Sequence, residues 1–510
     1  MIHLEINPES NPESNPESNP ESNPEINPEK MKSKSKSVKS KSKSKTVKSK
    51  SKSKTVKSKS KTKTIKSVKI PTRITKFFNK PETVRQANFL KGVCSDSGQC
   101  VTFGLESERV YKFFDNFELS PLVIDIKKIK RLGAPSVNGF VTEIPYKKEK
   151  YNAYAVLKSA IEKDSDNLYY EALVGLYLNK KGLIFPCFLQ TYDVFYYNNT
   201  HTYNSFRDNK VTDSTLLNNV TKLHNDFNYR NMFLKDTINR SCVDSKYMCV
   251  LIQHLKNAET LADLLEKYKK NEDFFTVFLV NILFQVYCPL SFLSDEFTHY
   301  DLHDSNVLIY EPSAMKKKHV TMIYHYPDNS TVQFNTYGIA KIIDYGRCYF
   351  NDKTEGFNSQ SFHKNLCNSK KCDNCGDDNG YTILQKEVFP GSFYHISSQK
   401  RNKSHDLRLA SKIFNIPGKF SGESSMSLRE LLSNVTYEDD FGTPEVLGDS
   451  YIENKKIQNV HDMHLALKDL MNQNYFKEKN EIIFQGSTLM GQLHVWVDGS
   501  KSTQYLVNNE

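Results

Sequence analysis

The uncharged stretch FFTVFLVNILFQVYCPLSFL, residues 274–293, constrains the fold more than any other part of this sequence. Its length and hydropathy would suit a membrane-spanning helix, which needs about 20 apolar residues. However, it contains Asn281, Gln285 and Pro289, and it leads directly into the polar segment HYDLHDSN, residues 299–306. We therefore predict that it is a buried core helix ending beside a polar loop, and we expect no transmembrane segment.

The first 75 residues are of low complexity. The tetrapeptide NPES repeats from Asn7, and Lys then alternates with Ser or Thr over residues 32–69. Neither part has enough apolar surface to offset the entropy of ordering it, so we predict a disordered tail over residues 1–75. Such a Lys-rich tail is either a solvated spacer or an arm that contacts nucleic acid or anionic surfaces.

The charge of the chain is confined to this tail. The formal net charge is +11, of which residues 1–31 contribute −6 and residues 32–69 contribute +17, so the remaining 441 residues are neutral. The basic pI therefore gives no reason to expect a folded body that binds nucleic acid. The ten cysteines are mostly scattered and the N-terminus lacks an apolar signal sequence, which predicts an intracellular protein.

Hydrophobic periodicity predicts a sheet-rich first half and a helix-rich second half. The predicted strands are residues 121–133, 139–146, 151–160 and 246–255, and residues 183–197 are extended. The predicted helices are residues 164–182, 258–268 and 461–472. A polar insertion is expected at about 197–245, and a hairpin insertion at 311–338.

Two acidic residues, Asp301 and Asp344, each lie at the edge of a short apolar strand, VLIY or IAKIID. Asn306 follows Asp301 by five residues. Carboxylate and amide oxygens are the ligands that Mg²⁺ prefers. A carboxylate that does not bind the metal can take a proton from a hydroxyl group.

These motifs resemble those of the protein kinases. HYDLHDSN resembles their catalytic loop, and DYG, residues 344–346, resembles their Asp-Phe-Gly metal motif. AVLK, ending at Lys158, is similar to their β-strand lysine motif, and Glu171 is similar to the glutamate that pairs with that lysine. The order of these elements along the chain also agrees with the family.

Three weaker matches extend the resemblance over about residues 120–415. LGAPSVNGFV, residues 132–141, is similar to the glycine-rich loop, although only Gly133 and Gly139 remain of its glycines. VLIQHL, residues 250–255, fits the hinge, and SHDLRLA, residues 404–410, resembles the helix whose aspartate, here Asp406, buttresses the catalytic loop. The whole pattern, tail included, resembles the divergent serine/threonine-protein kinase-like proteins of large DNA viruses, which implies the host cytoplasm or the virion.

The resemblance implies an α+β, two-lobed protein-kinase-like fold. A small lobe would hold a five-stranded antiparallel sheet and one main helix, and a mainly helical large lobe would follow. An N-terminal extension and the small lobe would span residues 76–255, and the large lobe residues 256–510. The large lobe would include a long activation segment at residues 347–404.

The resemblance also implies an ATP- and Mg²⁺-dependent kinase that phosphorylates serine or threonine hydroxyls of a protein substrate. Lys158 would bind the ATP phosphates, held by Glu171; Asp344 and Asn306 would bind Mg²⁺; and Asp301 would be the catalytic base. The expected nucleotide-binding residues are Gly133, Ser136, Gly139, Val141, Lys158, Glu171, Gln253 and Leu255.

The sequence departs from the family pattern at two positions of the loop. Tyr300 stands where many protein kinases have Arg, so activity would not depend on a phosphorylated activation segment. His303 stands where Ser/Thr kinases usually have Lys. A histidine at this position, two residues after the aspartate, is common in the aminoglycoside and choline kinases, which share the fold. A small-molecule kinase and a nucleotide-binding pseudokinase scaffold therefore remain alternatives.

A cysteine cluster lies inside the expected activation segment. His363, Cys367, Cys372 and Cys375 fall within thirteen residues, and three thiols with one imidazole would close a tetrahedral Zn²⁺ site. The alternatives are a flexible loop with free thiols, or a disulfide if the compartment is oxidising, since the spacing is not that of a common zinc finger. The sequence carries no signal for the oligomeric state.

Overall fold

The computed structural model describes residues 94, 99–101, 103–133, 139–161, 168–313, 318–365, 382–386, 393–414, 426–436 and 457–507. All of these belong to one compact unit. They form a mixed α+β structure with several antiparallel sheets, so the predicted α+β class is confirmed. The predicted tail, residues 1–75, lies outside the described residues.

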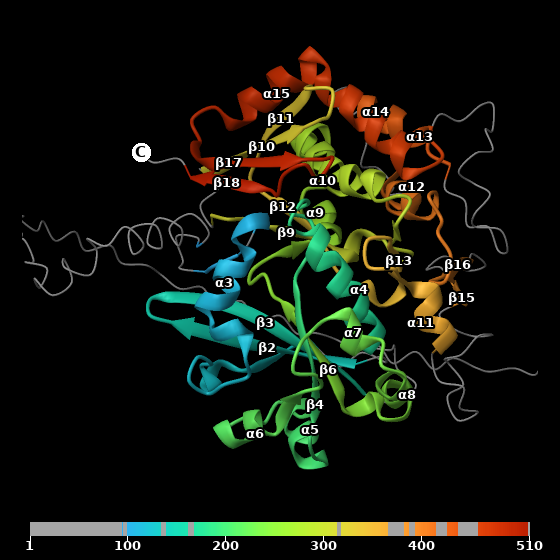
Figure 1. Ribbon diagram of the computed structural model, residues 1–510. Helices are drawn as coiled ribbons and strands as arrows, with labels where there is room; N and C mark the ends of the chain where they lie inside the picture. The colour runs from blue at the N-terminus through green and yellow to red at the C-terminus, as the bar shows by residue number, and fades with distance from the viewer. Residues whose placement is uncertain are drawn as a thin grey trace, which may run out of the picture. The chain divides into compact units, whose positions relative to one another are not determined.

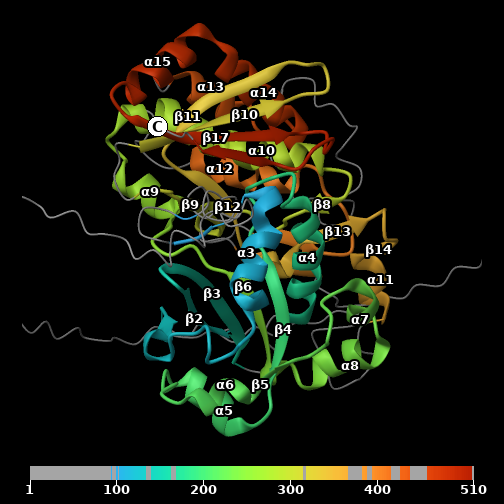
Figure 2. The same ribbon diagram turned by 60° about the vertical axis from the view of Figure 1, so that its left-hand side comes forward.

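A six-stranded sheet with strand order β1-β2-β3-β6-β4-β5 lies in the first half of the chain (Figures 1 and 2). All of its neighbouring strands are antiparallel. Its strands are β1 (Lys130–Leu132), β2 (Gly139–Lys148), β3 (Tyr151–Ala160), β4 (Thr191–Tyr197), β5 (Val220–Lys222) and β6 (Met248–Gln253). The predicted strands at 139–146, 151–160 and 246–255 are thus confirmed.

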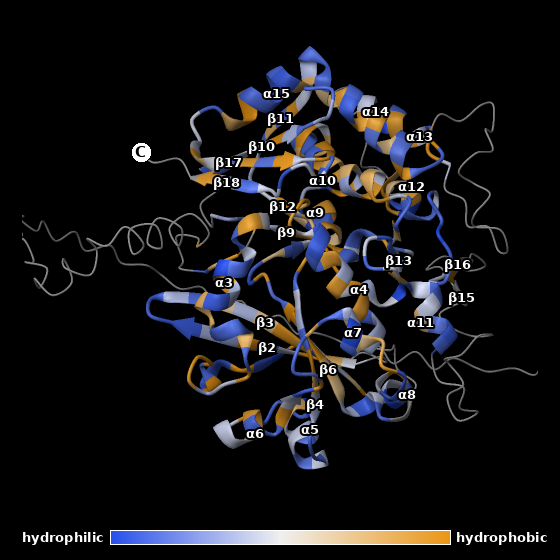
Figure 3. Ribbon diagram, viewed as in Figure 1, coloured by the Kyte–Doolittle hydropathy of each residue, from blue (hydrophilic) through white to orange (hydrophobic). Residues whose placement is uncertain are grey.

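Both faces of this sheet are buried. In β6, Cys249 and Leu251 join one hydrophobic cluster with the N-terminal helix α3 (Ser107–Phe113), whereas Met248, Val250 and Ile252 join a second cluster on the opposite face. Successive side chains of a strand point to opposite faces. The continuous apolar run of β6, visible in Figure 3, is therefore explained by burial on both sides.

The helix α4 (Leu168–Lys181) packs closely against β4 at Gly175. A Cβ atom added at Gly175 would lie 2.0 Å from Thr191 Oγ1 and 2.6 Å from Thr191 Cβ. We expect Gly175→Ala to lower the free energy of unfolding by about 1–3 kcal/mol, because overpacking outweighs the gain in helix propensity. Chemical denaturation would measure this, with Gly182→Ala as the matched control.

In the control, the added Cβ meets backbone oxygens no closer than 3.2 Å, and we expect a change within about 0.5 kcal/mol. An equal loss of unfolding free energy in both variants would show that the close contact with Thr191 is not the reason why position 175 requires glycine.

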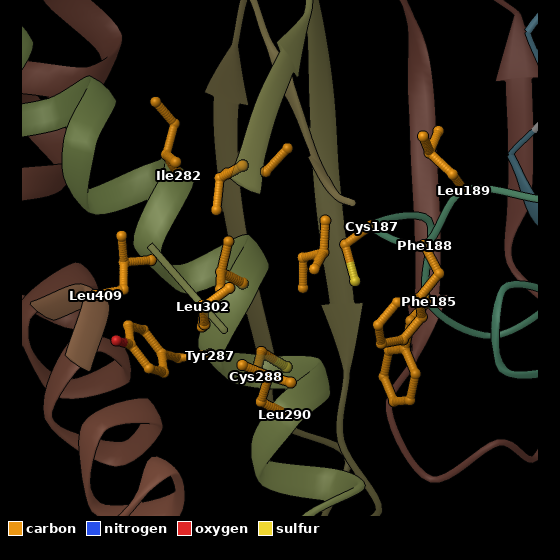
Figure 4. Packing of buried hydrophobic residues seen from close by; sticks show 14 of the residues in the cluster. Phe185, Cys187, Phe188, Leu189, Ile282, Tyr287, Cys288, Leu290, Leu302 and Leu409 are labelled. Atoms are coloured by element: carbon orange, nitrogen blue, oxygen red, sulfur yellow. The ribbon is translucent and has the colours of Figure 1, made fainter. Parts of the chain in front are cut away.

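The apolar stretch that opened the sequence analysis forms one helical run, a π-helical turn (Phe274–Phe278) followed by α10 (Leu279–Phe292). The run Phe274–Phe292 is long and apolar enough to cross a membrane, but 94% of its apolar window is buried inside the protein. Figure 4 shows Tyr287 and Cys288 of α10 among the other buried hydrophobic side chains. The prediction of a buried core helix is confirmed.

The predicted hairpin insertion is also confirmed. β10 (Lys318–His325) and β11 (Thr331–Thr336) are antiparallel, and the backbone N–H of Tyr326 donates to the carbonyl of Ser330 at 3.0 Å in the turn between them. The structure then pairs β10 with β17 (Thr488–Trp496) in parallel, and β17 with β18 (Gln504–Val507), into a four-stranded sheet.

Three expectations have to be corrected. The second half is not mainly helical, because the far C-terminal residues pair with the hairpin and cover it with α14 (Val460–Asn472) and α15 (Asn474–Phe484). The predicted strand at 121–133 is mostly irregular, since Lys130–Leu132 alone forms a strand with β2, Ile124 makes an isolated bridge to Tyr146, and Leu122 is 91% exposed. The first-half sheet also has six strands in place of five, because β5 comes from the predicted polar insertion.

Candidate functional site

A short antiparallel pair of strands brings two of the predicted residues to the same place. β9 (Val307–Tyr310) begins directly after Asn306, and β12 (Ile339–Ile342) ends two residues before Asp344. Val307 lies opposite Ile342, and the N–H of Ile343 donates to the carbonyl of Asn306 at 3.0 Å. The register of this pair therefore places Asn306 beside the residue that precedes Asp344.

Lys158 joins the first-half sheet to this pair of strands. Its Nζ atom lies 2.7 Å from Glu171 Oε2 on α4 and 2.7 Å from Asp344 Oδ1. Burial alone would lower the pKa of Lys158, but the two carboxylates raise it above its ordinary value. In turn the charge of Lys158 lowers the pKa of Asp344. Residues 158, 171 and 344 are thus brought into one ionised cluster.

The polar loop HYDLHDSN folds back on itself. The Asn306 side-chain amide donates to the carbonyl of Asp301 at 2.8 Å, and its backbone N–H donates to the carbonyl of His303 at 2.9 Å. Because the amide nitrogen of Asn306 is engaged in this way, its side-chain oxygen is the atom suited to a cation. A buried His299 ring nitrogen lies 2.9 Å from the carbonyl of Ile343 and so links the loop to the Asp344 segment.

Asp406 holds the loop by hydrogen bonds to its backbone, as the resemblance implied. Its carboxylate accepts the backbone N–H groups of His299 at 2.8 Å and Tyr300 at 3.0 Å, and its own side chain is buried. Burial raises the pKa of Asp406 to about 7. These bonds hold a loop in which Tyr300 has a positive φ of 64°, a backbone conformation that needs support from its surroundings.

Tyr300 has a structural role in this arrangement. Its side chain is 1% exposed, its hydroxyl donates to the carbonyl of Lys400 at 2.7 Å, and its ring packs 4.7 Å from that of His405. The residue therefore ties the loop to the chain near 400 through neutral contacts. Leu302, the next buried residue of the loop, belongs to the same core cluster as Tyr287 and Leu409 (Figure 4).

Sequence reasoning missed two basic residues at this site. Arg408 Nη1 lies 3.1 Å from Asp301 Oδ1, and Lys412 Nζ lies 2.9 Å from Asp304 Oδ1. Although burial opposes it, contact with His303 and Lys412 lowers the pKa of Asp304 to about 2. Only the i, i+4 spacing of the two basic residues on one helix pointed to a shared face, and that signal names no partner.

The expected glycine-rich loop and hinge are described in part. Gly133 has a φ of +67°, and a Cβ atom on Gly139 would lie 2.4 Å from the Ser159 carbonyl oxygen, so both positions need glycine. Val141 lies opposite Lys158 in the β2–β3 pair. Ser136 lies outside the described residues.

Of the two expected hinge residues, Gln253 ends β6, the strand next to β3, and Leu255 lies two residues beyond it. Gln253 lies opposite Ala155, its backbone N–H donates to the carbonyl of Gln190 at 2.8 Å, and Leu255 is 1% exposed. The structure therefore places them at the C-terminal end of β6, an inner strand that pairs with the strand carrying Lys158.

Of the four predicted zinc ligands, one lies among the described residues. Cys367, Cys372 and Cys375 lie outside the described residues, whereas His363 is buried in α11 (Ser359–Asn365) with its ring 4.8 Å from that of Tyr170. Burial lowers the pKa of His363 to about 3. Among the described residues, no group of three or more His, Cys, Asp or Glu side chains has the arrangement of a metal site.

One disulfide was not foreseen. Cys94 and Cys100 are bonded to each other, while Cys187, Cys249, Cys288 and Cys348 are buried free thiols.

Comparison with known proteins adds no assignment, since no protein-family model and no curated protein sequence matches this chain.

Proposed function

We propose that this protein is an ATP- and Mg²⁺-dependent kinase that transfers the γ-phosphate to serine or threonine hydroxyls of proteins. The proposal includes a two-lobed, protein-kinase-like arrangement of the described residues. The observation that carries it is the Lys158 ammonium group held at 2.7 Å from both Glu171 and Asp344, beside a loop that joins Asp301 to Asn306.

Phosphoryl transfer needs positioning and neutralisation of charge more than it needs covalent help from the protein. Lys158 is suited to hold the phosphates of ATP, since Glu171 fixes its direction and its charge is secure at neutral pH. Asp344 and Asn306 provide one carboxylate and one amide oxygen, a donor set that fits Mg²⁺. When bound, Mg²⁺ would neutralise charge on the phosphate oxygens.

Asp301 is proposed to receive the proton of the acceptor hydroxyl. The hydroxyl oxygen forms the new bond to the γ-phosphorus, the bond from that phosphorus to the bridging oxygen breaks, and ADP leaves with the bond's electrons. Asp301 is suited to this role because it is partly buried and its backbone carbonyl is fixed by Asn306.

The test is to incubate the purified chain with Mg²⁺ and γ-labelled ATP and to follow the label. We expect label on protein with the wild type and at least about 100-fold less with Asp344→Ala. A chain lacking residues 1–75 shows whether the Lys/Ser repeats are its own substrate. Label on an added aminoglycoside or choline, with none on protein, would favour a small-molecule kinase. ATP binding without any transfer would indicate a nucleotide-binding scaffold.

A further inference from the structure

The helix α12 (Arg408–Phe414) presents two basic residues to the polar loop, one helical turn apart. Arg408 pairs with Asp301 and Lys412 pairs with Asp304. The first pair is the more buried, because the Arg408 and Asp301 side chains are 8% and 18% exposed, whereas Lys412 is 36% exposed. A buried ion pair at a proposed catalytic residue calls for a functional explanation.

The charges of the site supply one. The site holds three carboxyl groups, those of Asp301, Asp344 and Glu171. Lys158 contacts only Asp344 and Glu171, and the charge of Arg347 also acts on Asp344. The loop itself, residues 299–306, contains no lysine or arginine. Arg408 therefore brings a full positive charge to the Asp301 carboxylate, where an anionic phosphoryl group would approach.

We infer that Arg408 is a positioning residue for phosphoryl transfer, which holds the Asp301 carboxylate in a fixed plane and supplies the cation that the loop lacks. This inference rests on the proposed function. A guanidinium group is planar and always charged, and its hydrogen bond to Asp301 Oδ1 restrains the rotation of that carboxylate. Asp301 is thereby aimed at the acceptor hydroxyl before it binds.

The competing explanation is that Arg408 only attaches α12 to the loop. The two explanations differ in kinetics. A positioning residue acts in the transition state, so its loss lowers kcat and leaves the KM for ATP nearly unchanged. A structural attachment lowers stability and disturbs the ATP-binding residues and Asp301 together.

The experiment compares Arg408→Ala with Lys412→Ala, a matched control on the same helix that breaks the neighbouring pair. For Arg408→Ala we expect kcat to fall about 100-fold or more, with the KM for ATP within about threefold of wild type. We also expect added guanidinium chloride, at millimolar concentrations that do not unfold the protein, to restore kcat at least about tenfold. Lys412→Ala should lower kcat at least about tenfold less than Arg408→Ala does, and its kcat should show no response to guanidinium.

Arg408→Lys is the second variant, in case the alanine variant does not fold. It keeps the charge but not the planar group, so we expect a kcat between those of the wild type and the alanine variant. Wild-type kcat in Arg408→Lys or Arg408→Ala, or a fall in kcat that guanidinium does not reverse and that Lys412→Ala shares, would overturn the inference alone. Absence of transfer by the wild-type chain would overturn the proposed function itself.

Discussion

Replacing Lys158 with methionine is expected to lower kcat/KM for phosphoryl transfer by about 10²- to 10³-fold, the cost of removing one preorganised charged donor. Methionine has a similar length but cannot neutralise phosphate oxygens. The variant also leaves two carboxylates, Glu171 and Asp344, that now face each other without their shared cation. Steady-state kinetics with labelled ATP would measure the loss.

Loss of this cation should also destabilise the protein, which has to be separated from its effect on chemistry. The Glu171 side chain is only 3% exposed, and an unpaired buried charge costs about 3–5 kcal/mol. The double variant Lys158→Met/Glu171→Gln removes that charge, so we expect it to recover most of the stability and none of the activity. Thermal unfolding of both variants would show whether stability and activity separate in this way.

Lys181→Met is the matched control, because Lys181 lies at the C-terminal end of α4, whereas Glu171 lies near its N-terminal end. Lys181 Nζ lies 2.7 Å from Glu296 Oε2, the same distance as in the Lys158–Glu171 pair, but Glu296 is 25% exposed whereas Glu171 is 3% exposed. Such a pair contributes little, about 0–1 kcal/mol, and lies outside the proposed site. A Lys158→Met variant with more than a tenth of wild-type activity would contradict the assigned role of Lys158.

The sequence predicted those parts of the fold in which the pattern of apolar residues is strong. Strands β2, β3 and β6 and helix α10 follow directly from alternation or from uninterrupted apolar runs. The sheet that joins β10 to β17 was missed, because a parallel pairing across about 170 residues leaves no local signal.

In the candidate site too, the residues in recognisable motifs were predicted and a long-range contact was missed. The resemblance to the protein kinases implied that Lys158, Glu171 and Asp344 act together, and the structure brings their charged atoms into contact. The contact of Arg408 with Asp301 was not predicted, because no local sequence signal links Arg408 to a loop more than 100 residues earlier. Contacts of this kind depend on the direction in which a helix crosses the loop, which the sequence does not encode at short range.

Replacing Asp406 with alanine is expected to lower the free energy of unfolding by about 2–5 kcal/mol, since it leaves two buried backbone N–H groups without an acceptor. These groups belong to His299 and Tyr300, so the same change should release the loop that carries Asp301. Urea denaturation would measure the stability. Asp295→Ala is the control, because that carboxylate is 58% exposed and pairs with Arg401 and Lys403 at the surface. We expect it to cost less than about 1 kcal/mol.

The pH dependence of stability tests the same residue independently. Burial raises the pKa of Asp406 to about 7, whereas an aspartate in an unfolded chain titrates near 4. Between these values the folded state retains a proton that the unfolded state has released, so the contribution of Asp406 is greatest below about pH 4 and is lost as the pH rises towards 7. The stability of wild type relative to Asp406→Asn, which does not titrate, should therefore fall over this interval and level off above it. A difference that rises with pH would mean that the two N–H groups outweigh burial and keep Asp406 ionised in the folded protein, and the loop would then be held by a buried charge.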